Sequence, residues 1–417
     1  MANKLWTGII TLVFCNSIIA QQKPELATGK WRGVLQRSDA NEIVFNFEVK
    51  NSGAKKIIYL LNASERLPAD DISYEGDSIF IKLPFFDSQF RAVINNKKQL
   101  QGNWIKRLAD RDVVLPFTAT HNETYRFNVK NNLPVANITG RWPAVFIDTI
   151  TQKKAIHIGV FEQKGNILTG SFLTASGDYR YLQGVVDGDS LKLSGFDGGF
   201  ALLFTAKINA DGTITGGRYY SGAGPAPQVW TAHKDNTAQL DDAATTGRLK
   251  KGMSPKVNFT FNDAYGKPVS FNDERFRNKV VVLQILGTWC PNCMDECELM
   301  GEMYKKYKSK GLEIIGLAYE RTTDAARSQA AIKNFIKRLN VIYPVLITPV
   351  AVGDPLRAEK TLPQLESIPA FPTTIFVDRK GEIQKIHSGF SGPGTGEDYI
   401  KQKQEYEHII NELLNSN

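Results

Sequence analysis

Three cysteines lie within eight residues of this 417-residue chain, in the stretch GTWCPNCMDEC from Gly287 to Cys297. Cys290 and Cys293 are three positions apart, so on a helix both face the same side, nearly one turn from each other. Such a pair can close a disulfide and pass two electrons by thiol–disulfide exchange. The spacing therefore predicts a redox-active dithiol.

The position of Cys290 predicts the order of the two thiols in the reaction. The mostly apolar run KVVVLQIL (279–286) ends just before it, and helix-forming residues follow over 290–308. Unpaired backbone amides and the helix dipole stabilise a thiolate at the first turn of a helix. We expect Cys290 to attack and Cys293 to resolve the mixed disulfide. Cys297 either fills core space as a small hydrophobe or acts as an additional resolving or regulatory thiol.

Other uses of the cysteines need residues that the sequence does not place nearby. A structural zinc site normally needs four ligands, and the five histidines are scattered singly along the chain. Covalent haem attachment would need histidine at the position of Met294. A purely structural disulfide over so short a link would constrain little chain. We therefore expect no metal and no cofactor.

The elements that must position the cysteines follow an alternating pattern in the last third of the chain. Strands are predicted at 257–261, 279–286, 312–319, 373–378 and 382–388, and helices at 290–308, 324–339 and 397–414. Strands that alternate with helices, followed by a hairpin and a terminal helix, are typical of a small α/β domain with a mixed sheet. We place this domain at 256–416.

The motifs of this domain resemble those of the thioredoxin-like superfamily, and within it the exported thiol–disulfide oxidoreductases of the TlpA and ResA type. The resemblance covers about 254–416 and includes GKPVSFND, VVVLQILGTWCPNC, LEIIGLAYE and IPAFPTTIFVDRKGEI. It implies disulfide-containing protein substrates and a membrane protein that delivers reductant. It also implies a cis peptide between Phe371 and Pro372 beside the cysteines, where Pro372 would orient the substrate strand. Trp289 and Phe371 would form the rim of the site.

Glu296 matches the acidic residue that this subgroup uses to tune or protonate its thiols. A nearby carboxylate raises a thiol's pKa by charge repulsion, or exchanges protons when it is desolvated. Thioredoxin itself carries a buried Asp six residues before the first motif cysteine, where this chain has Gln284. We therefore expect Glu296 to take over the acid–base role, with an exposed helix carboxylate as the alternative.

The first half of the chain contains two copies of one pattern. TGKW (28–31) recurs as TGRW (139–142), GDS (76–78) as GDS (188–190), and FTA (117–119) as WTA (230–232). Short β-rich runs separated by turn residues fill both copies. We predict two tandem all-β repeats, barrels or sandwiches, at 25–128 and 136–234, with Trp31 and Trp142 in their cores. A polar linker at 236–255 follows.

The first 20 residues are typical of a secretory signal, with Lys4, a mostly apolar run over 5–14 and Ala20 before Gln21. We therefore expect an exported, periplasmic protein. If Cys15 were instead the lipidated first residue of a lipoprotein, the chain would be anchored in the cell envelope. The net charge of +8 is spread along the chain, which gives no indication of nucleic-acid binding.

Several functions stay open on these grounds. The dipeptide Pro291-Asn292 helps to set the redox potential, but it does not give the direction of electron flow, so an oxidase or an isomerase stands beside the favoured disulfide reductase. A peroxiredoxin-like peroxidase could use Cys290. Alternatively, the β repeats could bind a ligand or anchor the molecule, with the redox domain as an accessory.

Overall fold

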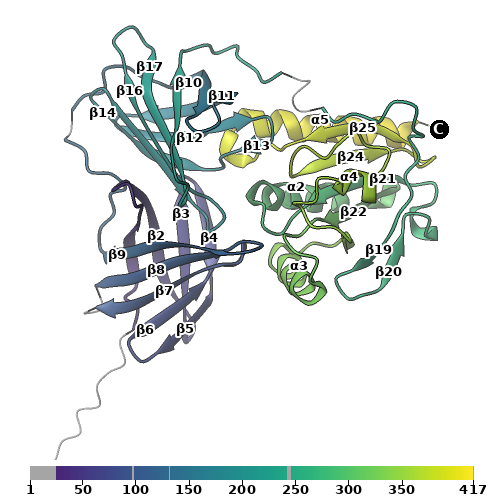
Figure 1. Ribbon diagram of the computed structural model, residues 1–417, viewed down its shortest axis with the longest axis horizontal. Coiled ribbons are helices and arrows are strands. Elements are labelled where there is room, and N and C mark those ends of the chain that lie inside the picture. The colour runs from purple at the N-terminus through teal and green to yellow at the C-terminus, as the bar shows by residue number, and fades with distance from the viewer. Residues whose placement is uncertain (1–24, 96–97, 131, 242–245, 417) are drawn as a thin grey trace, which may run out of the picture.

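The computed structural model describes residues 25–95, 98–130, 132–241 and 246–416. Two β domains lie next to each other, and a domain with helices packs beside them (Figure 1). The fold class predicted from the sequence, two all-β repeats followed by an α/β domain with a mixed sheet, is confirmed. The predicted signal segment and Cys15 lie outside the described residues, as does part of the predicted linker.

The first β repeat is one antiparallel sheet. Its strands are β1 (Gly29–Gln36), β2 (Glu42–Ser52), β3 (Lys55–Asn62), β4 (Glu65–Ala69), β5 (Asp71–Glu75), β6 (Ser78–Lys82), β7 (Ser88–Asn95), β8 (Gln99–Arg107) and β9 (Asp112–His121). Their order in the sheet is β4-β3-β2-β1-β9-β8-β7-β6-β5, so the two outermost strands follow each other directly in the chain. The sheet therefore curls into a nearly closed barrel (Figure 1).

The second β repeat has the same plan. Its strands are β10 (Gly140–Asp148), β11 (Lys154–Lys164), β12 (Ile167–Thr174), β13 (Gly177–Asp178), β14 (Leu182–Asp187), β15 (Ser190–Phe196), β16 (Ala201–Ile208), β17 (Ile214–Ser221) and β18 (Gln228–Ala232). Their order is β11-β10-β18-β17-β16-β15-β14-β12-β13, and an additional pairing of β11 with β12 closes the sheet. Alternating inward side chains fill the barrel with aromatic rings.

The duplicated TGKW and TGRW motifs have the same structural role in both repeats. Gly29 and Gly140 adopt φ values of +117° and +120°, a region that favours glycine. Two residues later, Trp31 and Trp142 are buried in the barrel cores, as predicted. Each indole N–H donates a hydrogen bond to the backbone oxygen four residues earlier, at 3.0 Å in the first repeat and 2.7 Å in the second.

The α/β domain is built on a mixed sheet of seven strands in the order β20-β19-β23-β22-β21-β24-β25. The strands are β19 (Thr260–Asp263), β20 (Pro268–Ser270), β21 (Val280–Leu286), β22 (Leu312–Ala318), β23 (Val345–Ile347), β24 (Thr373–Val377) and β25 (Ile383–Ser388). The α-helices are α2 (Pro291–Tyr307), α3 (Ala325–Leu339), α4 (Arg357–Thr361) and α5 (Glu397–Asn415), with 3-10 turns η1 (Glu274–Phe276), η2 (Lys308–Lys310) and η3 (Pro393–Thr395). Every residue of β21 is buried, as expected for a central strand.

Two details differ from the expected elements. The strand predicted at 257–261 begins later, at Thr260. The residues before it pair with a different part of the sheet, since Lys256 forms a bridge with Glu382 next to β25, whereas β19 pairs with β20 and β23. The short elements β23 and α4 were not predicted, since three and five residues are too few to show a periodicity.

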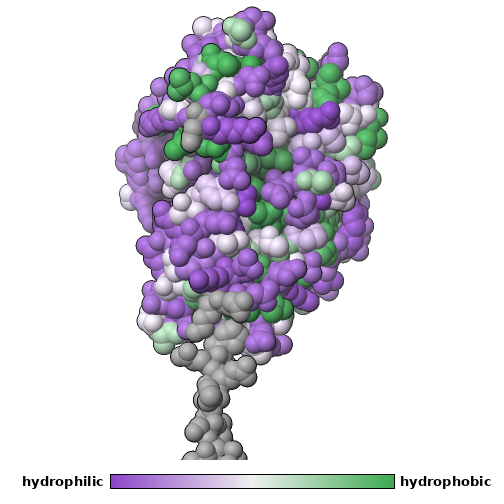
Figure 2. Space-filling model, turned by 90° about the vertical axis from the view of Figure 1, so that its left-hand side faces the viewer, coloured by the Kyte–Doolittle hydropathy of each residue, from purple (hydrophilic) through white to green (hydrophobic). Residues whose placement is uncertain are grey.

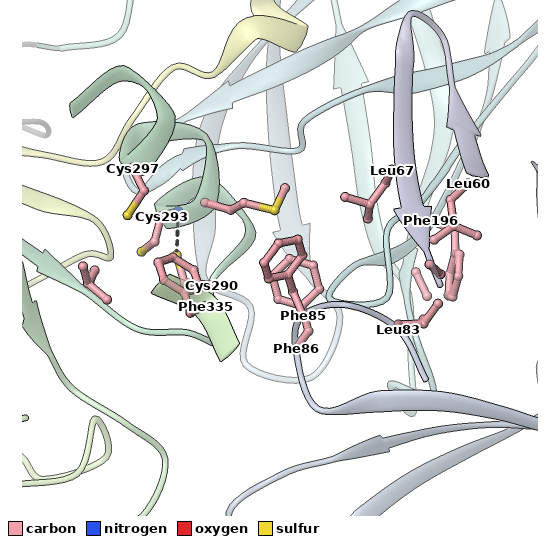
Figure 3. Packing of buried hydrophobic residues seen from close by; sticks show 14 of the residues in the cluster. Leu60, Leu67, Leu83, Phe85, Phe86, Phe196, Cys290, Cys293, Cys297 and Phe335 are labelled. Carbon is pink, nitrogen blue, oxygen red and sulfur yellow. Dashed lines mark hydrogen bonds between the residues drawn. The ribbon is translucent and has the colours of Figure 1, made fainter. Parts of the chain in front are cut away.

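The hydrophobic core continues from the first β repeat into the α/β domain. Figure 3 shows Phe85 and Phe86 between the cysteines of α2 and the barrel residues Leu60 and Leu67. The ring centroids of Phe85 and Phe335 on α3 are 6.1 Å apart. The three domains therefore share buried contacts. On the outer face of the β repeats, hydrophilic residues predominate (Figure 2). Within the described ranges, no helix has the length and apolar character needed to cross a membrane.

Candidate redox site

Cys290 lies where the turn after β21 meets the N-terminus of α2. The backbone N–H of Cys293 donates a hydrogen bond to Sγ of Cys290 at 3.2 Å (Figure 3). Cys290 is thus the N-cap residue of α2, with extended backbone angles, and its sulfur occupies the place where a helix favours negative charge. The cysteine thiol can also donate to the backbone oxygen of Phe371, 3.4 Å away. This is the position that the sequence predicted for the attacking sulfur.

Cys293 lies one turn further into the protein and is completely buried. Burial raises the pKa of its thiol well above the usual value, and the hydrogen bond and charge of Cys290 and the charge of Glu296 raise it further. The three cysteines of the described chain are free thiols. The first cysteine therefore lies at the surface side of the pair and the second on its core side, an order that suits an attacking and a resolving thiol.

Glu296 is a buried carboxylate in the core below the dithiol. One carboxylate oxygen accepts a hydrogen bond from Nε2 of Gln284 at 2.8 Å, and the other accepts from the hydroxyls of Thr374 and Tyr406. Burial raises the pKa of Glu296 to about 7, although these three hydrogen bonds lower it in part. A carboxyl that titrates near neutrality beside Cys293 can accept and return a proton. The alternative of an exposed helix carboxylate is wrong.

Gln284 also ties Cys297 into the same network. Its amide oxygen accepts hydrogen bonds from the Cys297 thiol at 3.3 Å and from the Tyr343 hydroxyl at 2.8 Å. Cys297 is buried, and burial raises the pKa of its thiol strongly. Its thiol therefore packs in the core as a hydrogen-bond donor, which agrees with the space-filling interpretation and leaves it poorly placed for attack on a substrate.

Trp289 and Phe371, which the sequence predicts to form the rim of the site, lie next to each other. Their ring centroids are 5.2 Å apart, and the Trp289 indole N–H donates to the backbone oxygen of Tyr319 at 2.9 Å. The peptide bond between Phe371 and Pro372 is cis, as the resemblance implied. Because the Phe371 oxygen accepts from Cys290, this loop lies directly against the attacking sulfur.

A buried carboxylate that the sequence did not single out holds the turn before Cys290. Glu320 accepts hydrogen bonds from the Thr288 backbone N–H at 3.0 Å and from its hydroxyl at 2.8 Å. Burial raises the pKa of Glu320. Glu320 lies just after the end of β22, which runs parallel to β21. Because the ends of neighbouring parallel strands meet at one edge of the sheet, the order of the strands could have placed Glu320 near Cys290.

The second β repeat covers the dipeptide between the two cysteines. Asn292 is buried, and its side-chain amide donates to the backbone oxygen of Asp178 at 3.2 Å. A Cβ atom added at Gly199 would lie 2.7 Å from Pro291, so the backbone of the repeat passes directly over this residue. The β repeats, which seemed separate from the redox motif in the sequence, thus form part of its surroundings.

A buried arginine fastens this cover to α2. Arg180, in the loop after β13, donates from Nε and Nη2 to both carboxylate oxygens of Asp295 at 2.8 Å. It also pairs with Asp197 of the second repeat at 2.9 Å and with Glu65 of the first repeat at 2.6 Å. Its side chain is only 3% exposed. One guanidinium therefore joins three domains. Its partner on α2, Asp295, lies two residues beyond Cys293. No local pattern in the sequence indicated it.

No group of three or more histidine, cysteine, aspartate or glutamate side chains is arranged to hold a metal ion in the part of the chain that the structure describes.

The comparisons with known proteins place the α/β domain among redox proteins. Residues 250–402 match the Redoxin family model. The chain is 33% identical over 145 residues to the thiol-disulfide oxidoreductase ResA of Bacillus thuringiensis subsp. konkukian, a match that covers 35% of this chain and 74% of that protein. It is 28% identical over 147 residues to ResA of Bacillus subtilis, covering 35% of this chain and 73% of that protein.

A solved structure of a thioredoxin-family thiol:disulfide interchange protein from Chlorobium tepidum matches 40% of this chain and 99% of its own, with 22% identity and a TM-score of 0.31. The sequence matches define the class of the chain as a thioredoxin-like redox protein. Through its C-terminal domain, the chain belongs to the family of the ResA thiol–disulfide oxidoreductases. The Redoxin match does not include the two β repeats.

Replacing Glu296 by glutamine should change how stability depends on pH. The usual pKa of this carboxyl is 4.5 and its pKa in the folded protein is about 7, so between these values the folded state holds the proton more tightly than the unfolded state does. Stability conferred by the protonated group is thus present below about pH 4.5 and lost as the pH rises through about 7. The variant has no carboxyl that titrates at this position, so its free energy of unfolding should not show this decrease. In the wild type the decrease should amount to about 3 kcal/mol between pH 4 and pH 8.

Urea unfolding of both proteins at the two pH values measures this difference. Asp178, whose pKa burial also raises to about 7, is present in both proteins, so its effect cancels. Glu302→Gln, on the exposed side of α2, is the matched control and should follow the wild type. The same pH dependence in the Glu296 variant and in the wild type would contradict the assignment.

Proposed function

We propose that this protein is an exported thiol–disulfide oxidoreductase that reduces disulfides in protein substrates through Cys290 and Cys293. The observation that carries the proposal is the geometry of the dithiol. Sγ of Cys290 accepts the Cys293 N–H at the first turn of α2, while Cys293 is buried beside a carboxyl group that titrates near neutrality. The membership of the ResA family supports the same chemistry.

The reaction needs two exchange steps. The Cys290 thiolate attacks one sulfur of the substrate disulfide, forms a mixed disulfide and releases the other substrate sulfur as a thiolate, which takes up a proton. Cys293 then gives its proton to the Glu296 carboxylate and attacks Sγ of Cys290. A disulfide now joins Cys290 to Cys293. The second substrate sulfur leaves as a thiolate and takes up the proton held by Glu296, while the proton for the first comes from solvent, which received one when Cys290 ionised. Two electrons have passed from the two cysteines to the substrate disulfide.

Substrate reduction in an exported protein requires a source of electrons. The first 20 residues have the pattern of a secretory signal, and an exported reductase needs electrons from a partner. We propose a periplasmic location and a membrane protein that delivers thiol reductant to the oxidised pair. If the chain is processed before Cys15 instead of near Gln21, it is lipid-anchored, and the mass of the mature protein distinguishes these two cases.

The equilibrium reduction potential of the Cys290–Cys293 pair tests the proposal. It is measured against glutathione buffers, with Cys297→Ala as a control that leaves only the two active thiols. A reductase should have a potential near that of thioredoxin, about −270 mV, whereas a value near about −120 mV would make the protein an oxidant. Failure to form the disulfide would rule out dithiol chemistry. Stoichiometric peroxide consumption would favour the peroxidase alternative.

A further inference from the structure

A groove lies between the first β repeat and the redox domain. Its volume is about 430 Å³. The loop 83–87, β7 and the end of β8 form one wall, and the start of α3 and residues 320–322 form the other. Thr288 and Trp289, the two residues that precede Cys290, also line it. This size is in the range of sites that bind small ligands or short chain segments, and it is far below that of a folded domain.

The second β repeat covers one side of the approach to Cys290, and the groove lies beside Trp289. The second repeat packs on Pro291 and Asn292, and Arg180 fastens the repeat to Asp295. Cys290 itself is only 3% exposed. A broad protein surface therefore cannot lie flat on the dithiol, whereas a narrow segment in the groove reaches the side of Trp289.

The groove wall and the sulfur are electrostatically connected through Arg321. The Arg321 guanidinium lies 5.4 Å from the ring centroid of Trp289 and donates to the backbone oxygen of Arg107 at 3.0 Å. Burial lowers the pKa of Arg321, and the charge of Cys290 is among those that raise it, so the two groups are within Coulombic range. An anionic segment beside Arg321 therefore also lies beside Trp289, the residue that precedes Cys290.

The charges that line the groove leave an excess of positive charge. The cations are Lys82, Arg91, Arg107, Arg321 and Arg327, and the anions are Asp87, Asp112 and Glu320. Asp87 pairs with Arg327 at 2.9 Å, and Asp112 with Arg107 at 3.5 Å. Burial raises the pKa of Glu320, while its hydrogen bonds from Thr288 and the charges of Arg321 and Arg327 lower it. Within the described ranges, Arg91 has no ion-pair partner, and its side chain is exposed on β7.

The apolar part of the groove suits the backbone and side chains of an extended segment. Phe85 and Phe86 of the first repeat and Phe335 of α3 contribute to its lining. Figure 3 shows these rings beside the cysteines of α2. These rings are almost fully buried and form an apolar base, over which an extended peptide can lie while its acidic groups meet the basic rim.

We propose that this groove is the substrate entrance to Cys290 and that it binds an extended, acidic, cysteine-bearing segment of a polypeptide. The inference rests on the proposed function and narrows its substrate class. The bound segment presents its disulfide at Trp289. The Cys290 thiolate then forms a bond to the cysteine sulfur of the segment. The other sulfur of that disulfide leaves as a thiolate and takes up a proton. Cys293 then closes the disulfide with Cys290 and releases the segment as a thiol.

The test compares two peptides that differ only in charge. Each carries one cysteine in a mixed disulfide with 2-mercaptoethanol, flanked by glutamates in one peptide and by lysines in the other. The fully reduced protein is mixed with each peptide, and release of the peptide thiol is followed in a single turnover. Each rate is divided by the rate with dithiothreitol, which corrects for the reactivity of the peptide itself. Bis(2-hydroxyethyl) disulfide serves as a substrate that needs no groove contact.

The wild type should reduce the acidic peptide about tenfold faster than the basic one, and high salt should reduce this preference. Arg91→Glu should remove most of it. Arg218→Glu, a matched change on exposed β17 outside the groove, should leave it intact. Equal rates for both peptides, or equal effects of the two variants, would overturn the proposal that the groove is the substrate entrance. Reduction of bis(2-hydroxyethyl) disulfide in the same experiment would still uphold the proposed disulfide reductase function. Failure with all three substrates would overturn both.

Discussion

Cys290→Ser is expected to lower the rate of disulfide reduction at least about a thousandfold, because a hydroxyl at neutral pH cannot replace a thiolate as the nucleophile. The residue sits at the N-terminus of α2 with its sulfur held by the Cys293 N–H, and it lies closer to the groove than either of the other two described cysteines, which are deeper in the core. Reduction of bis(2-hydroxyethyl) disulfide by the prereduced protein gives the rate.

Cys293→Ser should have a different signature. The attacking thiol is intact, so the first exchange step proceeds, but the mixed disulfide on Cys290 has no resolving partner and accumulates. Mass spectrometry of the trapped adduct identifies the attacked position. Cys297→Ala should retain most of the activity, because the Cys297 thiol is buried against Gln284. If the adduct formed on Cys297, or if Cys290→Ser stayed active, the order of the two thiols would be wrong.

Arg180→Leu is expected to cause the largest loss of stability. The guanidinium is buried and pairs with Asp295, Asp197 and Glu65, so its removal leaves these carboxylates unpaired in the protein interior. Loss of one partner from a buried ion pair typically costs about 3–5 kcal/mol. The loss should be smaller at pH 5 than at pH 8, because the unpaired carboxylates are neutralised more easily by protonation.

The midpoint of urea unfolding measures this loss, with Arg218→Leu on exposed β17 as the control, for which a change below about 0.5 kcal/mol is expected. A second readout reports on the cover itself. When the second repeat detaches from α2, Cys290 should react faster with a bulky alkylating reagent. A variant with the stability and alkylation rate of the control would show that Arg180 does not fasten the repeats to the dithiol.

The cover gives the β repeats a function that the thioredoxin-like domain alone would lack. In a single redox domain, the face around the dithiol is open to any protein that approaches it. Here Asp178 and Gly199 lie against the two residues between the cysteines, and Arg180 binds to α2 directly after them. The repeats therefore cover one side of the dithiol, and this geometry is the basis for the substrate entrance proposed above.

The local sequence determined the chemistry of this protein. The apolar run of β21, the cysteine spacing and the helix-forming residues after Cys290 define a dithiol at a helix N-terminus, since each signal depends on residues within a few positions. The motif around Pro372 predicted the cis peptide through its resemblance to the thioredoxin-like superfamily. The recurring short motifs predicted two copies, and the alternation of β-rich runs and turn residues predicted that both are all-β.

Only the tertiary structure decided what surrounds the dithiol. The sequence left Glu296 open between a buried and an exposed carboxylate, and its burial depends on Thr374 and Tyr406, which lie 78 and 110 positions away. Arg180 and Asp295 are 115 positions apart, and the groove joins residues of two domains. Such contacts arise when separately folded elements pack together. They leave no periodicity in the chain, so the sequence predicts which sulfurs react, whereas only the packing of the domains shows what surrounds them.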